Sequence, residues 1–388
     1  MLFGLDAIPL TEARAGVGHY TFELARALAR AAPADEFELA YPSTFPPIGL
    51  LETLPPNLKA ARVRVGALSR HWWSVGLPRY VRRRGVRLFH GTNYDVPLWG
   101  SAATVLTVHD LSLLLHPETH ERRRVRRARR RLPLMARSAD AVLTPTESVR
   151  REVCERLGVA PSKVFAVPEA AREFFGPMSF AETEEARRKV GAGEEFLLAV
   201  GTIEPRKNLT ALVAAFEEVV RARPARQLRL VIAGGRGWMS EPLFEAVERS
   251  SARERILLTG YLADEDLRLL YSSCRAFVYP SLYEGFGLPP LEAMSCGAPV
   301  VAGRTPAVAE VTGGAALLVN PKDPSEIARA LLELLDDEHA RRKLSDAGLR
   351  RAADFSWERT ARTTLEVYGE ALKKRMKDED RRGDRETG

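Results

Sequence analysis

"AFVYPSLYEGFGLPPLEAM", residues 276–294, has the pattern of a strand, a glycine-containing loop and a helix. The apolar run at its start is typical of a strand that is buried in a parallel sheet. Pro289 and Pro290 indicate the first turn of the helix, because proline is well tolerated at that position. Repeated strand–loop–helix units of this kind build an α/β fold, in which ligands bind at the carboxyl ends of the strands.

The loop between this strand and helix predicts an anion site that is flanked by two carboxylates. Its glycines let backbone amides at the positive end of the helix dipole approach a ligand closely, as a diphosphate requires. Glu284 in the loop can accept hydrogen bonds from hexose hydroxyls, and Glu292 can accept them from a second diol such as a ribose. The spacing is equally compatible with an alternative, in which Glu284 only caps the helix and Glu292 is a solvated helix residue.

Short apolar segments alternate with helical patterns along most of the chain, with a break near residues 173–195. The expected strands are residues 2–8, 36–42, 86–92, 102–110, 140–146 and 163–170 before the break, and 196–202, 228–235, 255–261, 276–281, 299–303 and 315–321 after it. Two successive runs of such units predict two doubly wound domains, whose facing sheets leave a cleft. Ligand-binding residues are therefore expected just after strands.

The composition is that of a globular protein with two domains, with 388 residues, 45% hydrophobic and 28% charged. No apolar run approaches the roughly 18 residues that a membrane span needs. The N-terminus has no basic leader, so we expect no signal peptide. The three cysteines, Cys154, Cys274 and Cys296, are scattered and suit reduced thiols in the cytoplasm rather than a disulfide framework or a zinc site.

Positive charge is concentrated in the first half of the chain. Residues 1–180 carry 26 Lys and Arg against 17 Asp and Glu, whereas the remainder carries 32 against 34. Eight arginines lie between Arg122 and Arg131, and a second cluster spans residues 80–87. A helix that carries the arginines between Arg122 and Arg131 can dock on an anionic membrane leaflet. The alternative, to which the sequence gives equal weight, is a basic face that is only solvated. Nucleic acid is disfavoured, because no stacking aromatics lie among these arginines.

"VGTIEPRKNL", residues 200–209, places two adjacent cations in a loop directly after a predicted strand. Arg206 supplies a planar fork and Lys207 a point charge, and together they can neutralise a leaving diphosphate. Taken alone, an Arg–Lys pair in a turn is more often an ordinary surface feature.

Two features of the first half also follow predicted strands. Gly16 and Gly18 resemble the opening of a dinucleotide-binding fingerprint, but Thr21 stands at its third position, so the match is weak. The strand at residues 102–110 ends in His109-Asp110, and a histidine at the carboxyl end of a strand is expected to face the cleft. His90, in the strand at residues 86–92, is a weaker candidate for the same reason. A hydrogen-bonded core histidine is the alternative for both.

The sequence offers no convincing metal site. Asp264–Asp266 is the Asp-x-Asp pattern that metal-dependent sugar transferases use, but it opens a predicted helix, with Asp264 as the expected N-cap. The other such triplet, residues 378–380, lies in the charged tail. No cluster of His, Cys and carboxylate residues has zinc spacing.

Seven ordered blocks together resemble one family, the retaining GT-B glycosyltransferases of the glycosyltransferase group 1 type. Its hallmark of two glutamates separated by seven residues is present as Glu284-GFGLPPL-Glu292. The other blocks are "AGVGHY", "TVHDLSLLLHPE", "VGTIEPRKNL", "LVIAGGRGW", "ILLTGYLADEDLRLLY" and "AVAEVTGGAALLVNP". One block departs from the family, since Val-Pro-Asn-Gly is replaced here by "VPEA", with Glu169 and Ala170.

The resemblance implies roles for these residues. Glu284 and His109 contact the transferred sugar, Glu292 binds the ribose, and Arg206 and Lys207 bind the donor phosphates and act in catalysis. The further donor phosphate contacts are Gly285, Phe286, Gly287 and Leu288, with Gly16 and Gly18 near the diphosphate. Glu310 and Tyr261 are lesser candidates, and Glu310 follows an alanine where the family often has proline.

The resemblance also implies an activity and a domain division. We expect a first domain of residues 1–175 with a returning helix at about 358–388, and a donor-binding domain of residues 180–357. The implied reaction moves a hexose, mannose being favoured with GDP-mannose as donor, to a saccharide or lipid-linked saccharide of a surface polysaccharide. It proceeds with retention, without metal or cofactor, in the cytoplasm or at the inner membrane face. A GT-B sugar-nucleotide epimerase and a binding module that uses the basic patch are the alternatives.

Overall fold

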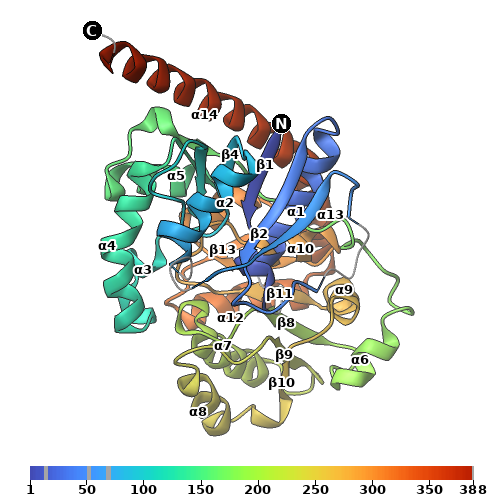
Figure 1. Ribbon diagram of the computed structural model, residues 1–388. Coiled ribbons are helices and arrows are strands. Elements are labelled where there is room, and N and C mark those ends of the chain that lie inside the picture. The colour runs from blue at the N-terminus through green and yellow to red at the C-terminus, as the bar shows by residue number, and fades with distance from the viewer. Residues whose placement is uncertain (13–15, 50–53, 67–70, 387–388) are drawn as a thin grey trace. The chain divides into compact units, whose positions relative to one another are not determined.

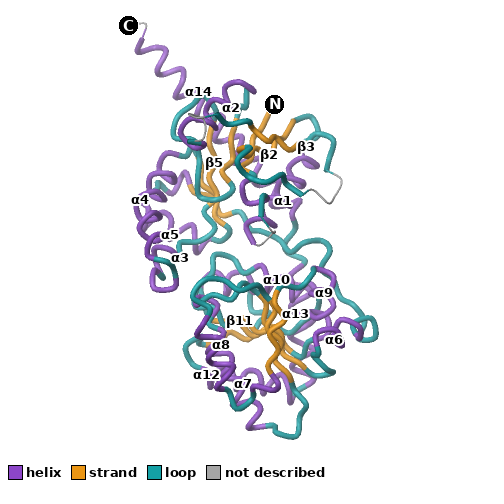
Figure 2. The backbone as a smooth tube through the Cα atoms, turned by 60° about the horizontal axis from the view of Figure 1, so that its bottom comes forward, coloured by secondary structure: helices purple, strands orange, loops and turns teal. Residues whose placement is uncertain are grey.

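The computed structural model describes residues 1–12, 16–49, 54–66 and 71–386, and side chains as far as Lys377. The chain divides into two compact units. The first contains Met1–Leu111, Arg126–Glu169 and Ser356–Gly388, and the second contains Ser112–Val125 and Ala170–Phe355. Each unit is built on one parallel sheet with helices on both of its sides (Figures 1 and 2).

The sheet of the first unit has seven parallel strands in the order β3-β2-β1-β4-β5-β6-β7. They are β1 (Leu2–Asp6), β2 (Glu36–Pro42), β3 (Leu58–Val63), β4 (Leu88–Gly91), β5 (Ala103–Thr107), β6 (Ala141–Thr144) and β7 (Val164–Ala166). The strand order reverses between β1 and β4, and this is the arrangement of a doubly wound domain.

The helices of the first unit connect these strands and close the domain. They are α1 (Gly16–Ala31), α2 (Leu77–Arg84), α4 (Arg122–Ser138, whose first turn belongs to the second unit), α5 (Glu147–Leu157) and α14 (Trp357–Glu386). The last helix, red in Figure 1, packs on α1, and its Tyr368 ring lies 5.5 Å from the ring of Phe3 in β1. The C-terminal helix thus belongs to the first unit, although the second unit precedes it in sequence.

The second unit has six parallel strands in the order β10-β9-β8-β11-β12-β13. They are β8 (Phe196–Val200), β9 (Arg229–Ala233), β10 (Ile256–Gly260), β11 (Ala276–Tyr279), β12 (Val300–Gly303) and β13 (Leu317–Val319). The helices are α3 (Ser112–Leu115), α6 (Glu184–Val190), α7 (Leu209–Ala222), α8 (Glu241–Arg249), α9 (Asp264–Ser273), α10 (Leu288–Ser295), α11 (Pro306–Thr312), α12 (Pro324–Asp336) and α13 (Glu338–Ala352).

The apolar strands of the second unit are explained by burial of both faces of its sheet. In β8, Leu197 and Ala199 pack into one core with residues of α7 and α12, whereas Phe196 and Leu198 pack into a second core with residues of α9 and α10. Because neither face of such a strand meets water, an uninterrupted apolar run replaces the alternating pattern of a half-exposed strand.

The segment Ser112–Val125 belongs to the second unit, although it follows β5 of the first. The indole Nε1 of Trp238 donates to the Thr119 carbonyl at 2.7 Å, and the His120 ring stacks on the same indole. The His116 ring lies 5.1 Å from the ring of Tyr283. This division differs from the expected first domain of residues 1–175, because Ser112–Val125 belongs to the second unit. In addition, the chain crosses to the second unit at Glu169–Ala170 rather than at residue 175.

Candidate active site

The second unit brings two loops together at its topological switch point. The strand β8 lies between β9 and β11, so the order of the strands reverses beside it. A short 3-10 helix, Pro205–Lys207, follows β8, and the loop that carries Glu284 follows β11. Ligands of open α/β sheets bind at such a point, outside the carboxyl ends of the strands.

Hydrogen bonds to backbone carbonyls join these two loops directly. The amide of Leu282 donates to the Arg206 carbonyl at 2.9 Å, and Nη1 of Arg206 donates to the Tyr283 carbonyl at 2.8 Å. Asn208 takes the left-handed conformation with φ of 56°, which asparagine tolerates well, and its Nδ2 donates to the Pro280 carbonyl. The cations and Glu284 are therefore held by backbone rather than by flexible side chains alone.

Glu284 lies between the two cations that the sequence predicted. Its Oε2 accepts from Nη1 of Arg206 at 2.6 Å, and its Oε1 accepts from Nζ of Lys207 at 2.7 Å. Burial alone would raise the pKa of the Glu284 carboxyl, but the charges of Arg206 and Lys207 outweigh it and lower the pKa to about 2. Glu284 is therefore ionised at any physiological pH and is a strong hydrogen-bond acceptor.

Glu204 is a member of this cluster that the sequence analysis missed. Its Oε1 accepts from Nη2 of Arg206 at 2.5 Å, and its side chain is buried. Burial raises the pKa of Glu204, and the charges of Arg206 and Lys207 oppose that effect. An acid two residues before a basic pair, in a loop after a strand, was the available signal. Glu204 and Glu284 thus hold different nitrogens of the Arg206 guanidinium, Nη2 and Nη1.

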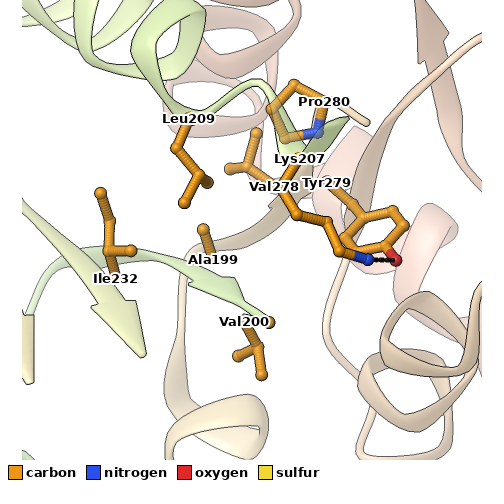
Figure 3. Close-up of a pocket in the computed structure, with 9 residues that line it drawn as sticks. Ala199, Val200, Lys207, Leu209, Ile232, Val278, Tyr279 and Pro280 are labelled. Atoms are coloured by element: carbon orange, nitrogen blue, oxygen red, sulfur yellow. Dashed lines mark hydrogen bonds between the residues drawn. The ribbon is translucent and has the colours of Figure 1, made fainter. Parts of the chain in front are cut away.

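A small pocket surrounds the stem of Lys207, as Figure 3 shows. Nζ of Lys207 donates to the Tyr279 hydroxyl at 2.7 Å, and it lies 4.8 Å from the centre of that ring. The other residues that line the pocket have no polar side chains, and they are Ala199, Val200, Gly201, Leu209, Ile232, Val278 and Pro280. The apolar walls confine the lysine stem and fix the direction of its ammonium group.

The start of α10 has the geometry that the loop sequence predicted. Gly287 is the N-cap with φ of 108°, a conformation that favours glycine, Leu288 is the first helical residue, and prolines occupy the second and third helical positions. Pro289 and Pro290 have no N–H, so the amide donors at this helix end are those of residues 285–288. Phe286 is buried against Phe355. A left-handed glycine and a packed aromatic fix this turn.

Glu292 faces α9 and the segment that follows the crossing point. Nε and Nη2 of Arg172 both donate to its Oε1 at 3.3 Å, and Nη1 of Arg172 donates to Asp264. Burial raises the pKa of Glu292 to about 7, although Arg172 acts in the opposite direction. Glu292 is thus a buried, ion-paired residue and not a solvated helix position.

The Asp264–Asp266 triplet has a different role from the expected cap. The N-cap of α9 is Ala263, and Asp264 is the first helical residue. Asp264 pairs with Arg172, and Asp266 pairs with Lys189. In the part of the chain that the structure describes, no group of three or more His, Cys, Asp or Glu side chains is placed to hold a metal ion.

His109 lies in the first unit, two residues after the end of β5 at Thr107, with both ring nitrogens in contact with acceptors. Its Nε2 donates to the Thr92 carbonyl at 2.8 Å, and its Nδ1 lies 3.3 Å from Oε1 of Glu169. The Tyr20 ring meets the imidazole edge-on at 4.7 Å. A sugar hydroxyl that binds a nitrogen of His109 must therefore share or replace one of these partners.

His90 is a core residue. Its Nδ1 bonds the Tyr368 hydroxyl and its Nε2 bonds the Thr107 hydroxyl, both at 2.7 Å. Burial, with a smaller effect of His109, lowers the pKa of His90 to about 3, so the ring is neutral. The alternative weighed for the two histidines, a hydrogen-bonded core residue, therefore holds for His90.

Four further candidates belong to other elements than the two loops that carry Arg206, Lys207 and Glu284. Gly16 and Gly18 belong to the first unit and lie in the first turn of α1, whereas a loop was expected for both. Glu310 is exposed on α11. Tyr261 follows β10 and is 66% exposed.

Comparison with known proteins shows to which family the chain belongs. The family "Glycosyl transferases group 1" matches residues 182–351, and "Glycosyltransferase Family 4" matches residues 14–170. The O-antigen chain mannosyltransferase B of Escherichia coli is 33% identical over 382 residues, which cover 95% of this chain and 99% of that protein. This chain belongs to the group 1 glycosyltransferases.

Solved structures show that this glycosyltransferase has the GT-B fold. Sucrose-phosphate synthase from Thermosynechococcus elongatus superposes with a TM-score of 0.75 and 23% identity, over 95% of this chain and 98% of that one. Anabaena HepE in complex with UDP and glucose gives a TM-score of 0.74 at 18% identity, over 95% and 99% of the two chains.

The basic helix of this glycosyltransferase, α4, exposes most of its arginines. Arg131 is an exception, because its Nε donates to Asp95 at 2.5 Å. The guanidinium of Arg124 lies over the Trp238 ring, 5.3 Å from its centre. Among the residues that the structure describes, no helix is long and apolar enough to cross a bilayer.

Proposed function

We propose that this glycosyltransferase moves mannose from GDP-mannose to a saccharide or lipid-linked saccharide acceptor in surface polysaccharide biosynthesis, with retention of anomeric configuration and without a metal ion. The observation that carries the proposal is the ionised Glu284, held between Arg206 and Lys207 at the switch point of the second sheet. The relationship to an O-antigen mannosyltransferase over nearly the whole chain supports mannose as the sugar.

Arg206 and Lys207 would bind the donor diphosphate. Lys207 has three N–H groups, of which Tyr279 and Glu284 accept two. The four charges of Glu204, Glu284, Arg206 and Lys207 balance, so the diphosphate brings the excess negative charge that amides of residues 285–288 would offset. Fixed donors of this kind stabilise a departing diphosphate without reorganisation, and this is the function that the proposal assigns to the cluster.

The two glutamates would bind different parts of the donor. Glu284 would accept hydrogen bonds from hydroxyls of the transferred mannose, and Glu292 from the ribose diol. Neither acts as a hydrolytic acid or base in this proposal, because the departing diphosphate would assist deprotonation of the incoming hydroxyl. His109, Gly16 and Gly18 would contribute contacts to the sugar and diphosphate from the first unit, and Glu310 and Tyr261 remain lesser candidates for donor contacts.

A donor panel tests this proposal. Thermal unfolding of the purified protein would be measured with GDP-, UDP-, ADP- and dTDP-sugars, each with and without EDTA. We expect GDP-mannose to raise the melting temperature most, with no effect of EDTA. Stabilisation by a uridine donor alone, or loss of stabilisation on chelation, would contradict the donor or the metal-free part of the proposal.

The anomeric outcome and the competing epimerase activity are separated by the products. NMR of the product formed from GDP-mannose and an oligomannoside acceptor should give the α-anomeric signal of retained configuration. A sugar-nucleotide epimerase would instead change the donor when no acceptor is present. Appearance of a new sugar nucleotide in acceptor-free reactions would therefore replace transferase by epimerase as the activity.

The exposed arginines of α4 would hold the enzyme at an anionic leaflet where a lipid-linked acceptor lies. We expect cosedimentation with vesicles that contain anionic phospholipid, at about 1 kcal/mol per arginine near the surface, and its loss at high salt. The variant Arg126→Glu/Arg129→Glu/Arg130→Glu should stay in the supernatant, whereas Arg223→Glu/Arg249→Glu, with exposed arginines of the second unit, should bind as the wild type does. Equal binding of both variants would remove the membrane part of the proposal.

A further inference from the structure

Arg172 is a buried cation to which the proposed function assigns no role. It lies three residues after the crossing point between the two units, and its side chain is 12% exposed. All three guanidinium nitrogens donate to carboxylates, two of them to Glu292 and the third to Asp264. Its guanidinium also lies 4.6 Å from the centre of the Phe175 ring.

The surroundings hold Arg172 in this position. Phe175 is buried and meets the Tyr271 ring of α9 edge-on. The segment then continues along α9, where Nε of Arg268 donates to the Gly176 carbonyl at 3.0 Å and Arg268 lies over the Phe174 ring. Arg172 and Arg268 thus anchor the same segment to the same helix, but the described bonds to Glu292 come from Arg172.

The charge of Glu292 depends on this contact. Asp264 and Tyr271 of α9, Cys296 at the end of α10 and Arg172 are the titratable or charged groups that face Glu292. Burial and Asp264 disfavour the ionised form, and Arg172 is the cation that opposes them. An ionised carboxylate can accept from both hydroxyls of a diol through two oxygens, whereas a protonated one loses part of this capacity.

We propose that Arg172 is a positioning residue, which keeps the Glu292 carboxylate charged and fixed in place for the ribose diol of the donor. The inference rests on the proposed function, because it requires that Glu292 binds the ribose. Asp264 completes the arrangement by holding the third guanidinium nitrogen, which fixes the rotation of the fork. Arg172 itself needs no contact with the nucleotide.

The test compares a nucleotide that has the diol with one that lacks it. Calorimetric binding of GDP and 2′,3′-dideoxy-GDP would be measured for the wild type, Arg172→Met, Arg172→Lys, Glu292→Ala and the matched control Arg268→Met. The wild type should bind GDP roughly 10- to 100-fold more tightly than 2′,3′-dideoxy-GDP, as expected for charge-assisted hydrogen bonds. This ratio of the two affinities is the quantity compared between variants. Arg172→Met should reduce the ratio to below about 3-fold, Arg172→Lys should restore part of it, and Arg268→Met should keep it.

The pH dependence separates a charge effect from a general loss of structure. The pKa of Glu292 is about 7, so the wild-type ratio should rise between pH 6 and pH 8. Without Arg172 this rise should move to higher pH, so the ratio in Arg172→Met should recover toward pH 9. If Arg172→Met does not fold, Arg172→Met/Asp264→Asn removes a cation and an anion together and should show a smaller shift in the same direction, because Asp264 acts on the pKa of Glu292 in the opposite sense to Arg172.

Two results overturn the inference in distinguishable ways. If Arg172→Met keeps the full ratio at every pH while Glu292→Ala loses it, Arg172 has no positioning role and the ribose role of Glu292 stands. If Glu292→Ala keeps the wild-type ratio, Glu292 does not bind the ribose, and that part of the proposed function fails together with the inference.

Discussion

Replacing Lys207 by alanine is expected to lower kcat/KM for sugar transfer by roughly 100- to 1,000-fold, the usual effect of removing one fixed donor from a developing negative charge. The loss should fall mainly on kcat, because the ammonium compensates charge that grows as the diphosphate departs. Lys207→Arg should recover only part of the activity, since a planar guanidinium does not fit the small, mainly apolar pocket around the lysine stem.

Initial-rate kinetics with the donor selected by the thermal panel measure this effect. The matched control is Arg223→Ala, which removes an exposed cation that pairs with Asp336. Arg223 is the C-cap of α7, at the opposite end of that helix from the loop of Lys207. The control should retain wild-type kcat/KM. A Lys207→Ala enzyme within about 3-fold of the wild type would mean that the diphosphate is stabilised elsewhere.

Replacing Glu284 by glutamine is expected to lower kcat/KM by roughly 10- to 100-fold and to destabilise the second unit. The first effect follows from the loss of charge-assisted hydrogen bonds to the sugar. The second follows from its pKa of about 2, against an ordinary value of 4.5. A lowered pKa stabilises the fold above pH 4.5, and that contribution, about 3 kcal/mol, disappears as the pH falls toward 2.

Urea unfolding at pH 7 and at pH 3 tests the stability part of this prediction. The wild type should be more stable than Glu284→Gln at pH 7, and the difference should narrow at pH 3, because at pH 3 the carboxyl of the unfolded chain, with its ordinary pKa of 4.5, is protonated and unfolding takes up a proton. The control Asp336→Asn, at an exposed position, should show no such convergence. A difference that is equal at both pH values would show that the ionised form of Glu284 contributes nothing to stability.

The fold was largely predictable because the buried strands can be recognised in the sequence. Strands such as β8 and β11 are uninterrupted apolar runs, since both faces of the sheet are covered. The strand that was missed, β3, is "LKAARV" at a sheet edge, where exposed Lys59 and Ala60 interrupt the apolar pattern. The charged C-terminal tail continues α14 to Glu386.

The candidate site was predictable in its residues but not in its pairing. The position of Arg206, Lys207 and Glu284 after strands implied a shared edge, and the structure brings them into direct ion pairs. The roles of Glu204 and Arg172 could not be read from sequence, because each depends on contacts across loops or helices. Arg172 contacts residues 92 and 120 positions away, and such distant pairs leave no local pattern. Glu169 is bonded to His109 in the same way, within the block that departs from the family.

A crystal structure of the enzyme with GDP-mannose tests most directly whether the carboxyl edge of β8 and β11 holds the donor. The account predicts a diphosphate oxygen about 3 Å from Nζ of Lys207, with the phosphates against the amides of residues 285–288 and the ribose diol on Glu292. Density for the nucleotide at any other place on the second unit, with Lys207 and Glu284 still paired and uncontacted, would contradict it.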